Sequence, residues 1–135
     1  MQQISLFFAG CLIAFGTAAF AQDAADYQNW MKTAGATTGS LRKNLEAKNA
    51  DAAGADAKKL ADVFRQVHDF WHKKGVEDAM MAAMDASAKF KEVGELASSA
   101  KFDDATAELK KAMSTCGTCH AAHREKAADG SWKLK

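Results

Sequence analysis

LADVFRQVHDFWHKKG, residues Leu60 to Gly75, carries the clearest structural pattern in the chain. Its large apolar side chains recur every three or four residues, at Leu60, Phe64, Val67 and Trp71, with Val63 and Phe70 beside them. That period matches one face of an α-helix, and a glycine after a basic pair is a typical helix end. We therefore expect a helix over about 51–74 that buries one face in a helical core.

The same period appears three more times along the chain. Upstream, a helix over about 23–47 is predicted by a stripe of mostly apolar residues: Tyr27, Met31, Ala34, Thr38, Leu41 and Leu45. A helix over about 76–97 is expected to turn inward Val76, Met80, Ala83, Met84, Ser87 and Phe90. A fourth, over about 103–127 and capped by Asp103 or Asp104, continues one stripe through Leu109, Met113, Cys116 and His120. Residues 128–135 have no period and are expected to be irregular.

The length and composition of the chain suit a single helical domain. It has 135 residues and no proline, and helix-favouring residues are abundant. Helices of about 20 residues joined by short links must run antiparallel to their neighbours. The sequence therefore predicts an all-α fold, an antiparallel up-down-up-down four-helix bundle over residues 22–135.

The N-terminal segment has the features of an export signal. The first 21 residues contain no charged side chain and end in Ala19-Phe20-Ala21, with small residues where a signal peptidase reads. We expect residues 1–21 to be a cleaved signal peptide. Because no Lys or Arg precedes the apolar run, a retained membrane anchor is the alternative. A lipid on Cys11 is a weaker alternative, since the apolar run continues past that residue.

The charge balance narrows the classes of partner. The formal net charge is +1, with acidic and basic residues interspersed. Nucleic-acid binding requires a basic face, so no nucleic-acid partner is expected. A charge so near zero also indicates weak electrostatic steering toward any docking partner.

Residues 116–120 read Cys-Gly-Thr-Cys-His, the C-x-x-C-H pattern of c-type haem attachment. Two cysteines three apart on a helix share nearly one face, so both can add to the two vinyl groups of one haem. The histidine that follows can present an imidazole nitrogen to the iron. We expect one covalent haem c held by Cys116 and Cys119, with His120 as the proximal iron ligand.

Two other readings of the cysteine pair are weaker. A thioredoxin-like redox pair would open a helix after a strand, whereas this one lies near the end of a predicted helix. A zinc site could recruit Cys116, Cys119, His120 and His123. Four ligands on one helix cannot surround an ion tetrahedrally, however, so the helix would have to break.

The predicted bundle brings three parts of the chain to the end that holds this motif. These are the start of the first helix, the end of the fourth, and the link between the second and third. The residues expected there are Tyr27, Trp30, Met31, Val67, His68, Phe70, Trp71, His72, Val76, Met80 and Met81. Bulky, adaptable side chains of this kind suit a large apolar macrocycle, although a plain core role is the simpler expectation for most of them.

Two stretches resemble the cytochrome c-prime family, the class II c-type cytochromes. CGTCHAAHR, residues 116–124, resembles the family's C-x-x-C-H-x-x-x-R, and MKTAGATTGSL, residues 31–41, resembles the M-K-x-x-G-x-x-x-G-x-L of its low-spin members. The resemblance covers about residues 27–126. Together with the expected export signal, it implies a periplasmic protein with redox protein partners and no membrane association after the signal is cleaved. Dimerisation through the first two helices is common in that family.

The resemblance also implies two kinds of iron site. Low-spin members place a methionine of the first helix on the iron, at the position of Met31, and the closed site transfers single electrons. High-spin members leave the iron five-coordinate and bind small gases such as nitric oxide or carbon monoxide. We take Met31 as the expected sixth ligand and the open gas-binding site as the alternative.

The surroundings of the haem are predicted less directly. Arg124 matches the family's basic residue near the proximal histidine. Where the family often has an arginine four residues before the methionine, this chain has Tyr27, which is expected beside the haem without the charged propionate contact of that arginine. His68 and His72 are rival sixth ligands, whereas His123 shares the helix of His120 and is disfavoured. No acid–base pair accompanies the motif, so we do not expect an enzyme.

Overall fold

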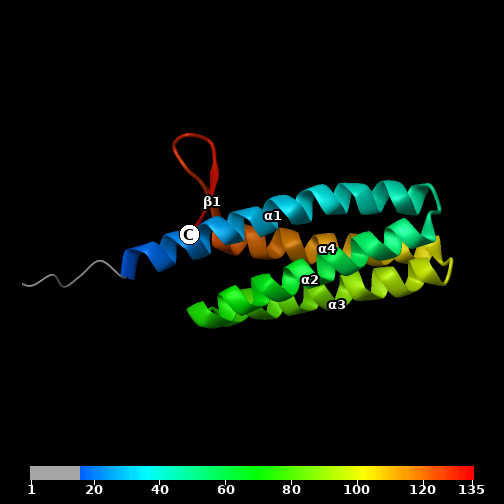
Figure 1. Ribbon diagram of the computed structural model, residues 1–135, viewed down its shortest axis with the longest axis horizontal. Helices are drawn as coiled ribbons and strands as arrows, with labels where there is room; N and C mark the ends of the chain where they lie inside the picture. The colour runs from blue at the N-terminus through cyan, green and yellow to red at the C-terminus, as the bar shows by residue number, and fades with distance from the viewer. Residues whose placement is uncertain (1–15) are drawn as a thin grey trace, which may run out of the picture.

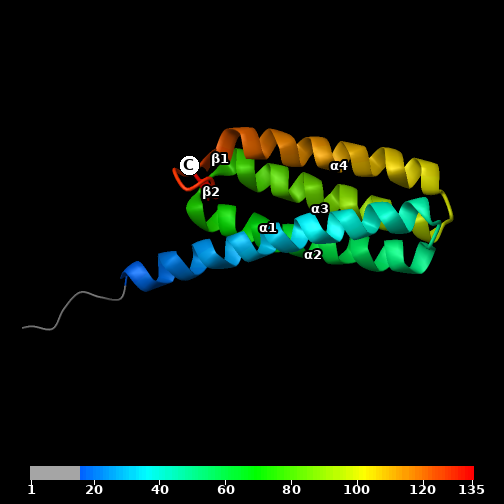
Figure 2. The same ribbon diagram turned by 90° about the horizontal axis from the view of Figure 1, so that it is seen from above.

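Four long helices account for most of the described chain. The structure is a computed structural model and describes residues 16–135. Its helices are α1 (Gly16–Glu46), α2 (Ala50–Lys74), α3 (Glu77–Ser98) and α4 (Phe102–His123). They pack against one another along a common direction (Figure 1, and from above in Figure 2). The predicted all-helical class and the four helices are confirmed.

The ends of α2 show how local chemistry sets a boundary. The side chain of Asn49 accepts a hydrogen bond from the Ala52 backbone N–H at 3.2 Å, which satisfies one of the free donors of the first turn. At the other end Gly75 has a φ of 68°, a left-handed conformation that favours glycine. The predicted stop at Gly75 is confirmed.

The predicted cap of the fourth helix is wrong. Lys101 occupies the cap position and its side chain makes no capping hydrogen bond. Asp103 and Asp104 lie inside the first turn instead. Their charges are still favourable there because the N-terminal end of a helix carries a partial positive charge.

Contacts between α2 and α3 pair the end of one helix with the start of the other. His72 meets Met80, the Phe64 and Phe90 rings stack with centroids 5.4 Å apart, and Gly94 lies against Ala57. A side chain added at Gly94 would come within 3.2 Å of the Ala57 Cβ, so small residues allow these helices to approach closely. Polar contacts also join the other neighbouring helices, from Asn44 to Asp56 and from Thr115 to Asp85.

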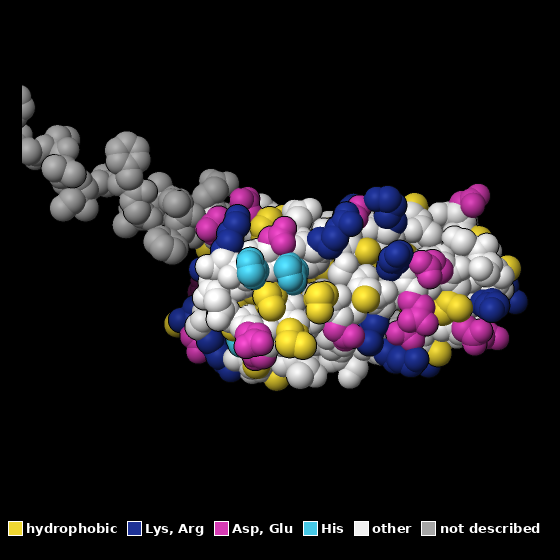
Figure 3. Space-filling model, turned by 90° about the horizontal axis from the view of Figure 1, so that it is seen from below, with side chains coloured by type: hydrophobic (Ala, Val, Ile, Leu, Met, Phe, Trp, Pro, Cys, Tyr) yellow, Lys and Arg dark blue, Asp and Glu magenta, His cyan; other side chains and the backbone are white. Residues whose placement is uncertain are grey.

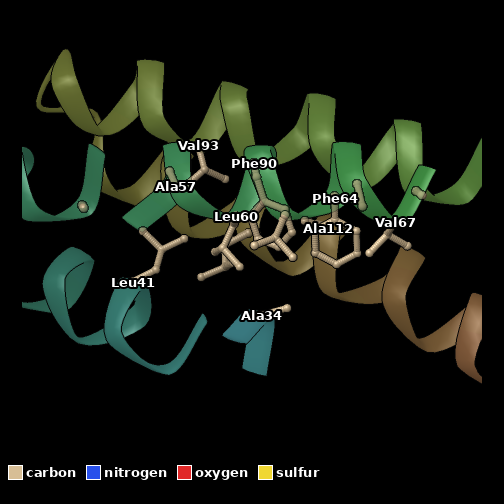
Figure 4. Close-up of a cluster of buried hydrophobic side chains, with 14 of the residues drawn as sticks. Ala34, Leu41, Ala57, Leu60, Phe64, Val67, Phe90, Val93 and Ala112 are labelled. Carbon is tan, nitrogen blue, oxygen red and sulfur yellow. The ribbon is translucent and has the colours of Figure 1, made fainter. Parts of the chain in front are cut away.

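Side chains from all four helices meet in the core (Figure 4). Leu41, Leu60 and Phe90 are among its largest fully buried members. The predicted inner face of the third helix is wrong at Met84, which is 55% exposed. The buried face consists largely of alanines, whose small side chains allow α3 to lie close to α2: Ala79, Ala83, Ala86, Phe90, Val93 and Ala97.

The C-terminal segment is a short β-hairpin, so the predictions of a helix to 127 and an irregular tail are wrong. Strand β1 (Arg124–Lys126) pairs antiparallel with β2 (Trp132–Leu134), and the hairpin projects beside α1 (Figure 1). The turn is closed at Asp129, whose carboxylate accepts from the backbone N–H and hydroxyl of Ser131. The Gln28 side-chain amide donates to the Trp132 carbonyl at 3.1 Å and ties the hairpin to α1.

The N-terminal predictions fall mostly beyond the described part of the chain. Residues 1–15, including Cys11, lie outside it, and α1 begins at Gly16, ahead of the expected cleavage after Ala21. Within residues 16–135, none of the helices combines the length and apolarity needed to cross a membrane.

Candidate functional site

A cavity of about 380 Å³ lies between α1 and α4, with part of its wall from α2 and α3. Its volume falls in the range of roughly 300–1,000 Å³ that is usual for ligand pockets. Gly35 and Gly39 line it from α1, and a side chain built at either would meet nothing within 4 Å. Small residues on α1 thus leave open a space that larger ones would fill.

A second cavity, of about 590 Å³, lies next to the first and is bounded by the hairpin. Both are lined by Tyr27, Met31, Cys119, His120 and Arg124. The open space therefore continues from the seam between α1 and α4 to the region beneath β2.

All six residues predicted for the site line the first cavity. Cys116, Cys119 and His120 reach it from α4, Tyr27 and Met31 reach it from α1, and Arg124 reaches it from the start of β1. Tyr27 is buried, and the other five are partly buried. The motif near the C-terminus and the methionine near the N-terminus thus face one space, although they are far apart in the sequence.

Much of the larger cluster predicted at this end of the bundle does come together: Tyr27 packs against Phe70 and Trp71. Most of the cluster, however, does not line the cavities. Of those eleven residues, only Tyr27, Met31 and Val67 line either cavity. The reason is the direction of the first cavity, which extends along α1 as far as Arg42 rather than across the end of the bundle.

The cavity also has lining residues that the sequence reasoning did not assign to a site. Thr38 and Arg42 come from α1, Phe64 from α2, Ala86 from α3 and Met113 from α4. One feature of the sequence does indicate that α1 lines a cavity: small and polar residues recur at helical spacing from Gly35 to Arg42.

The histidines considered as rival ligands are placed away from the cavities. His68 and His72 line neither of them, and their rings stack in parallel with centroids 6.0 Å apart. His123 borders only the second cavity, where its Nε2 lies 2.8 Å from an Asp78 carboxylate oxygen.

Burial sets the chemistry of the two cysteines. It raises the pKa of Cys116 to about 11, helped by the neighbouring Cys119. Burial also raises the pKa of Cys119, and the negative charge of Asp78 adds to the effect. Both side chains are therefore protonated thiols near neutral pH, whereas a thioredoxin-like redox pair depends on a thiol whose pKa is lowered.

The imidazole and the phenol at the cavity are both held neutral. Burial lowers the pKa of His120, and the positive charge of Arg124 lowers it further. Neutral imidazole is the form that ligates metals. Burial raises the pKa of Tyr27 to about 12, with the nearby Cys119 the next largest cause, so its hydroxyl keeps its proton.

Arg124 presents an unsatisfied donor at the cavity wall. Its guanidinium stacks on the Trp132 ring at 3.8 Å, and its Nε is buried without a hydrogen-bond partner among the described residues. A buried N–H of this kind is costly unless an acceptor reaches it. A carboxylate at the edge of a bound cofactor, such as a haem propionate, is a suitable acceptor.

The donor set suits a covalent haem better than an ion held by protein groups alone. Two thiols share one helix face, a neutral imidazole follows them, and a thioether faces the same cavity. Within residues 16–135, no group of three or more His, Cys, Asp or Glu side chains lies close enough together to hold a metal ion. The zinc site considered from the sequence, with Cys116, Cys119, His120 and His123 as ligands, is therefore not formed.

Comparisons with family models, curated proteins and solved structures find no match for this chain. The resemblance to class II cytochromes therefore rests on the two quoted motifs.

Proposed function

We propose that this chain is a periplasmic mono-haem c-type cytochrome, an antiparallel up-down-up-down bundle that transfers single electrons between redox partner proteins. Cys116 and Cys119 would attach the haem, while His120 and Met31 would ligate its iron. One observation carries the proposal: Met31 on α1 and the C-x-x-C-H residues on α4 line the same cavity.

A haem bound here would supply an iron centre that accepts and returns one electron. The chain contributes the surroundings that tune and protect it. Met31 offers a thioether, a ligand that raises the reduction potential of haem iron. Apolar side chains of Phe64, Val67 and Ala83 form the inner wall and limit access of water.

Hydrogen-bond donors at the cavity would orient the cofactor. Arg124 has a buried Nε–H without a partner, and Tyr27 keeps its hydroxyl proton because its pKa is raised to about 12. Carboxylates accept well from both kinds of group. Arg124 and Tyr27 would therefore be the donors to a haem propionate at this wall of the cavity.

Electron transfer accounts for these residues better than catalysis does. A haem peroxidase needs a distal histidine that moves protons, and neither His68 nor His72 lines the cavity. We therefore propose no enzymatic activity for this site.

The proposal is tested by producing the full chain with its leader in a bacterial host that attaches haem in the periplasm. We expect a red protein whose haem remains bound after denaturation and gives the pyridine haemochrome spectrum of two thioether links. The variant with both Cys116→Ser and Cys119→Ser serves as the control without attachment. A colourless native chain would overturn the proposal.

Binding of a small gas at a five-coordinate haem is the second candidate, and the open space beside Gly35 and Gly39 favours it. Carbon monoxide separates the two functions. If Met31 ligates the iron, adding the gas to the reduced protein leaves the spectrum unchanged. A rapid change in the Soret band would instead establish the open site.

A further inference from the structure

Two histidines and two methionines lie together on the face formed by α2 and α3. They are His68 and His72 on α2 with Met80 and Met84 on α3, here called the His–Met cluster. Figure 3 shows two histidine side chains side by side over this face, with hydrophobic side chains next to them. None of the four lines either of the two cavities described above.

The first pair in the cluster already has the spacing of two ligands on one ion. His72 Nδ1 and Met80 Sδ are 3.4 Å apart. Metal–nitrogen bonds of about 2.0 Å and metal–sulfur bonds of about 2.3 Å, at near-tetrahedral angles, place two such atoms about 3.3–3.6 Å apart. An ion can therefore bind between them with little movement of either side chain.

His68 is oriented as metal-binding histidines are. It lies one turn before His72 on the same helix face, with the two rings parallel and 6.0 Å apart between centroids. Its Nδ1 lies 3.0 Å from a carboxylate oxygen of Asp69. A proton on Nδ1 would be donated to that oxygen, leaving Nε2 free to ligate, which is how carboxylates usually support metal-bound histidine.

Met84 completes the cluster by its position in the antiparallel pair. His72 contacts Met80, and Phe64, eight residues earlier on α2, contacts Phe90, ten residues later on α3. Moving back one turn along α2 therefore corresponds to moving forward about one turn along α3. Met84 therefore lies at the level of His68. Its side chain is 55% exposed, so packing in the core does not account for it.

We propose that the His–Met cluster is a binding site for copper(I). Thioether sulfur is a soft ligand that selects copper(I), and imidazole suits copper as well. Magnesium, calcium and manganese prefer carboxylate, carbonyl and water oxygens, and the cluster itself offers imidazole and thioether groups. The site lies on the surface and does not depend on the haem.

Equilibrium dialysis of the full haem-loaded chain against copper(I) under anaerobic conditions tests this. Free thiols are alkylated first, because cysteines in any haem-free molecules would bind copper themselves. Copper and iron per chain are then measured by atomic absorption, and parallel samples are dialysed against zinc(II). We expect one copper(I) per chain, with zinc(II) bound at least about tenfold more weakly.

Variants identify the ligands. Met80→Leu and His72→Ala should each weaken copper(I) binding by at least about tenfold. Met81→Leu is the control, since Met81 is the next methionine of α3, is exposed, and lies about 100° further round the helix than the partly buried Met80. The leucine changes keep the side-chain volume, so unfolding does not confuse the result.

X-ray absorption at the copper edge provides a readout independent of affinity. We expect both nitrogen and sulfur neighbours, with the sulfur signal reduced in Met80→Leu. Loss of binding in Met81→Leu but not in Met80→Leu would overturn the assignment. Equal binding of zinc(II) with no effect of Met80→Leu, or no bound copper at all, would also overturn it. A chain that holds copper without haem would refute only the cytochrome proposal.

Discussion

At the scale of single residues, Met31 is where the two candidate functions diverge. It lines the cavity from α1, opposite the C-x-x-C-H residues of α4. If its sulfur ligates the iron, Met31→Ala should remove the sixth ligand and leave the iron open. Carbon monoxide should then bind rapidly to the reduced variant, and the far-red band of an iron–thioether bond should disappear from the oxidised spectrum. Absorption spectroscopy with and without the gas measures both changes.

Met81→Ala is the matched control for this experiment. It removes an exposed thioether of α3 that borders neither cavity. We expect it to behave like the native protein toward carbon monoxide. Identical spectra for the native chain and Met31→Ala would rule out Met31 as a ligand.

The sequence predicts the chemistry of the site better than its shape. Cys116, Cys119 and His120 follow from one contiguous motif whose spacing has a chemical reason. The cavity walls at Gly35, Thr38 and Arg42 do not follow from any motif. A cavity forms where small side chains leave space between helices, and no local pattern in the sequence shows the extent of that space. A periodic stripe indicates which face turns inward but not whether that face meets a neighbour or an open space.

At the scale of elements, the sequence predicts most helix ends to within one residue but misses the start of α1 and the end of α4. The repeated apolar residues of α2 are compatible only with a helix that buries one face. The end of α4, in contrast, depends on a competition between further helical hydrogen bonds and strand pairing. Arg124, Glu125 and Lys126 show no apolar alternation. Their strand exists because residues 132–134 supply hydrogen-bond partners and because Arg124 stacks on Trp132, neither of which is local information.

The hairpin should therefore depend on Trp132. Trp132→Ala removes the ring over which the Arg124 guanidinium lies, at 3.8 Å, and near which the Lys126 ammonium lies, at 5.3 Å. Contacts of this kind at exposed sites contribute about 0.5–1 kcal/mol. We expect the free energy of unfolding to fall by about that amount and amide exchange in residues 124–134 to accelerate. Urea denaturation and hydrogen exchange read by mass spectrometry measure the two effects.

Lys133→Ala is the control within the same strand. Its ion pair with Glu125, 3.1 Å long, is exposed on both sides and should contribute little. If Lys133→Ala loosens the hairpin as much as Trp132→Ala does, strand pairing rather than ring stacking holds it.

A second element-scale prediction concerns the contact between α3 and α4. The Thr115 hydroxyl donates to an Asp85 carboxylate oxygen at 2.7 Å, and Lys89 donates to the other oxygen at 2.8 Å. Thr115→Val removes one hydrogen-bond donor, so that Lys89 is the remaining donor to the Asp85 carboxylate. Because Asp85 is 46% exposed, we expect a loss of only about 0.5–1 kcal/mol in the free energy of unfolding near neutral pH, measured by urea denaturation.

The effect of Thr115→Val should depend on pH in a known direction. Lys89, and next Thr115, lower the pKa of Asp85 below its ordinary value of 3.8 in the folded chain. A carboxylate with a lowered pKa stabilises the fold above its ordinary pKa, and this contribution is lost as pH falls further. The loss from Thr115→Val should thus shrink below about pH 3.8. Thr106→Val is the control on the same helix, because the Thr106 side chain makes no hydrogen bond to another helix within residues 16–135; it should show no such trend. A pH-independent loss at Thr115 would instead indicate a packing effect.

At the scale of the whole molecule, the cavity makes α1 the least supported helix. Toward α2 it is held by contacts such as Tyr27 against Phe70, with ring centroids 4.6 Å apart, and by the Asn44 amide, which donates to Asp56 at 2.8 Å. On the side of α1 that faces α4, the cavity lies between the two helices. A haem attached to α4 and ligated by Met31 would join the two helices across that space.

Removal of the haem should therefore loosen α1 more than the rest of the bundle. In the chain with both Cys116→Ser and Cys119→Ser, we expect amide exchange in residues 23–46 to accelerate by about tenfold or more, which corresponds to a loss of at least about 1.4 kcal/mol of local stability. Exchange in the α2–α3 core around Leu60 and Phe90 should change less, because those residues pack on each other. Cys116→Ser alone keeps one attachment point and serves as the haem-bearing control. If the haem-free double variant protects α1 as well as the native chain does, then packing on α2 is sufficient and α1 needs no cofactor to hold it in place.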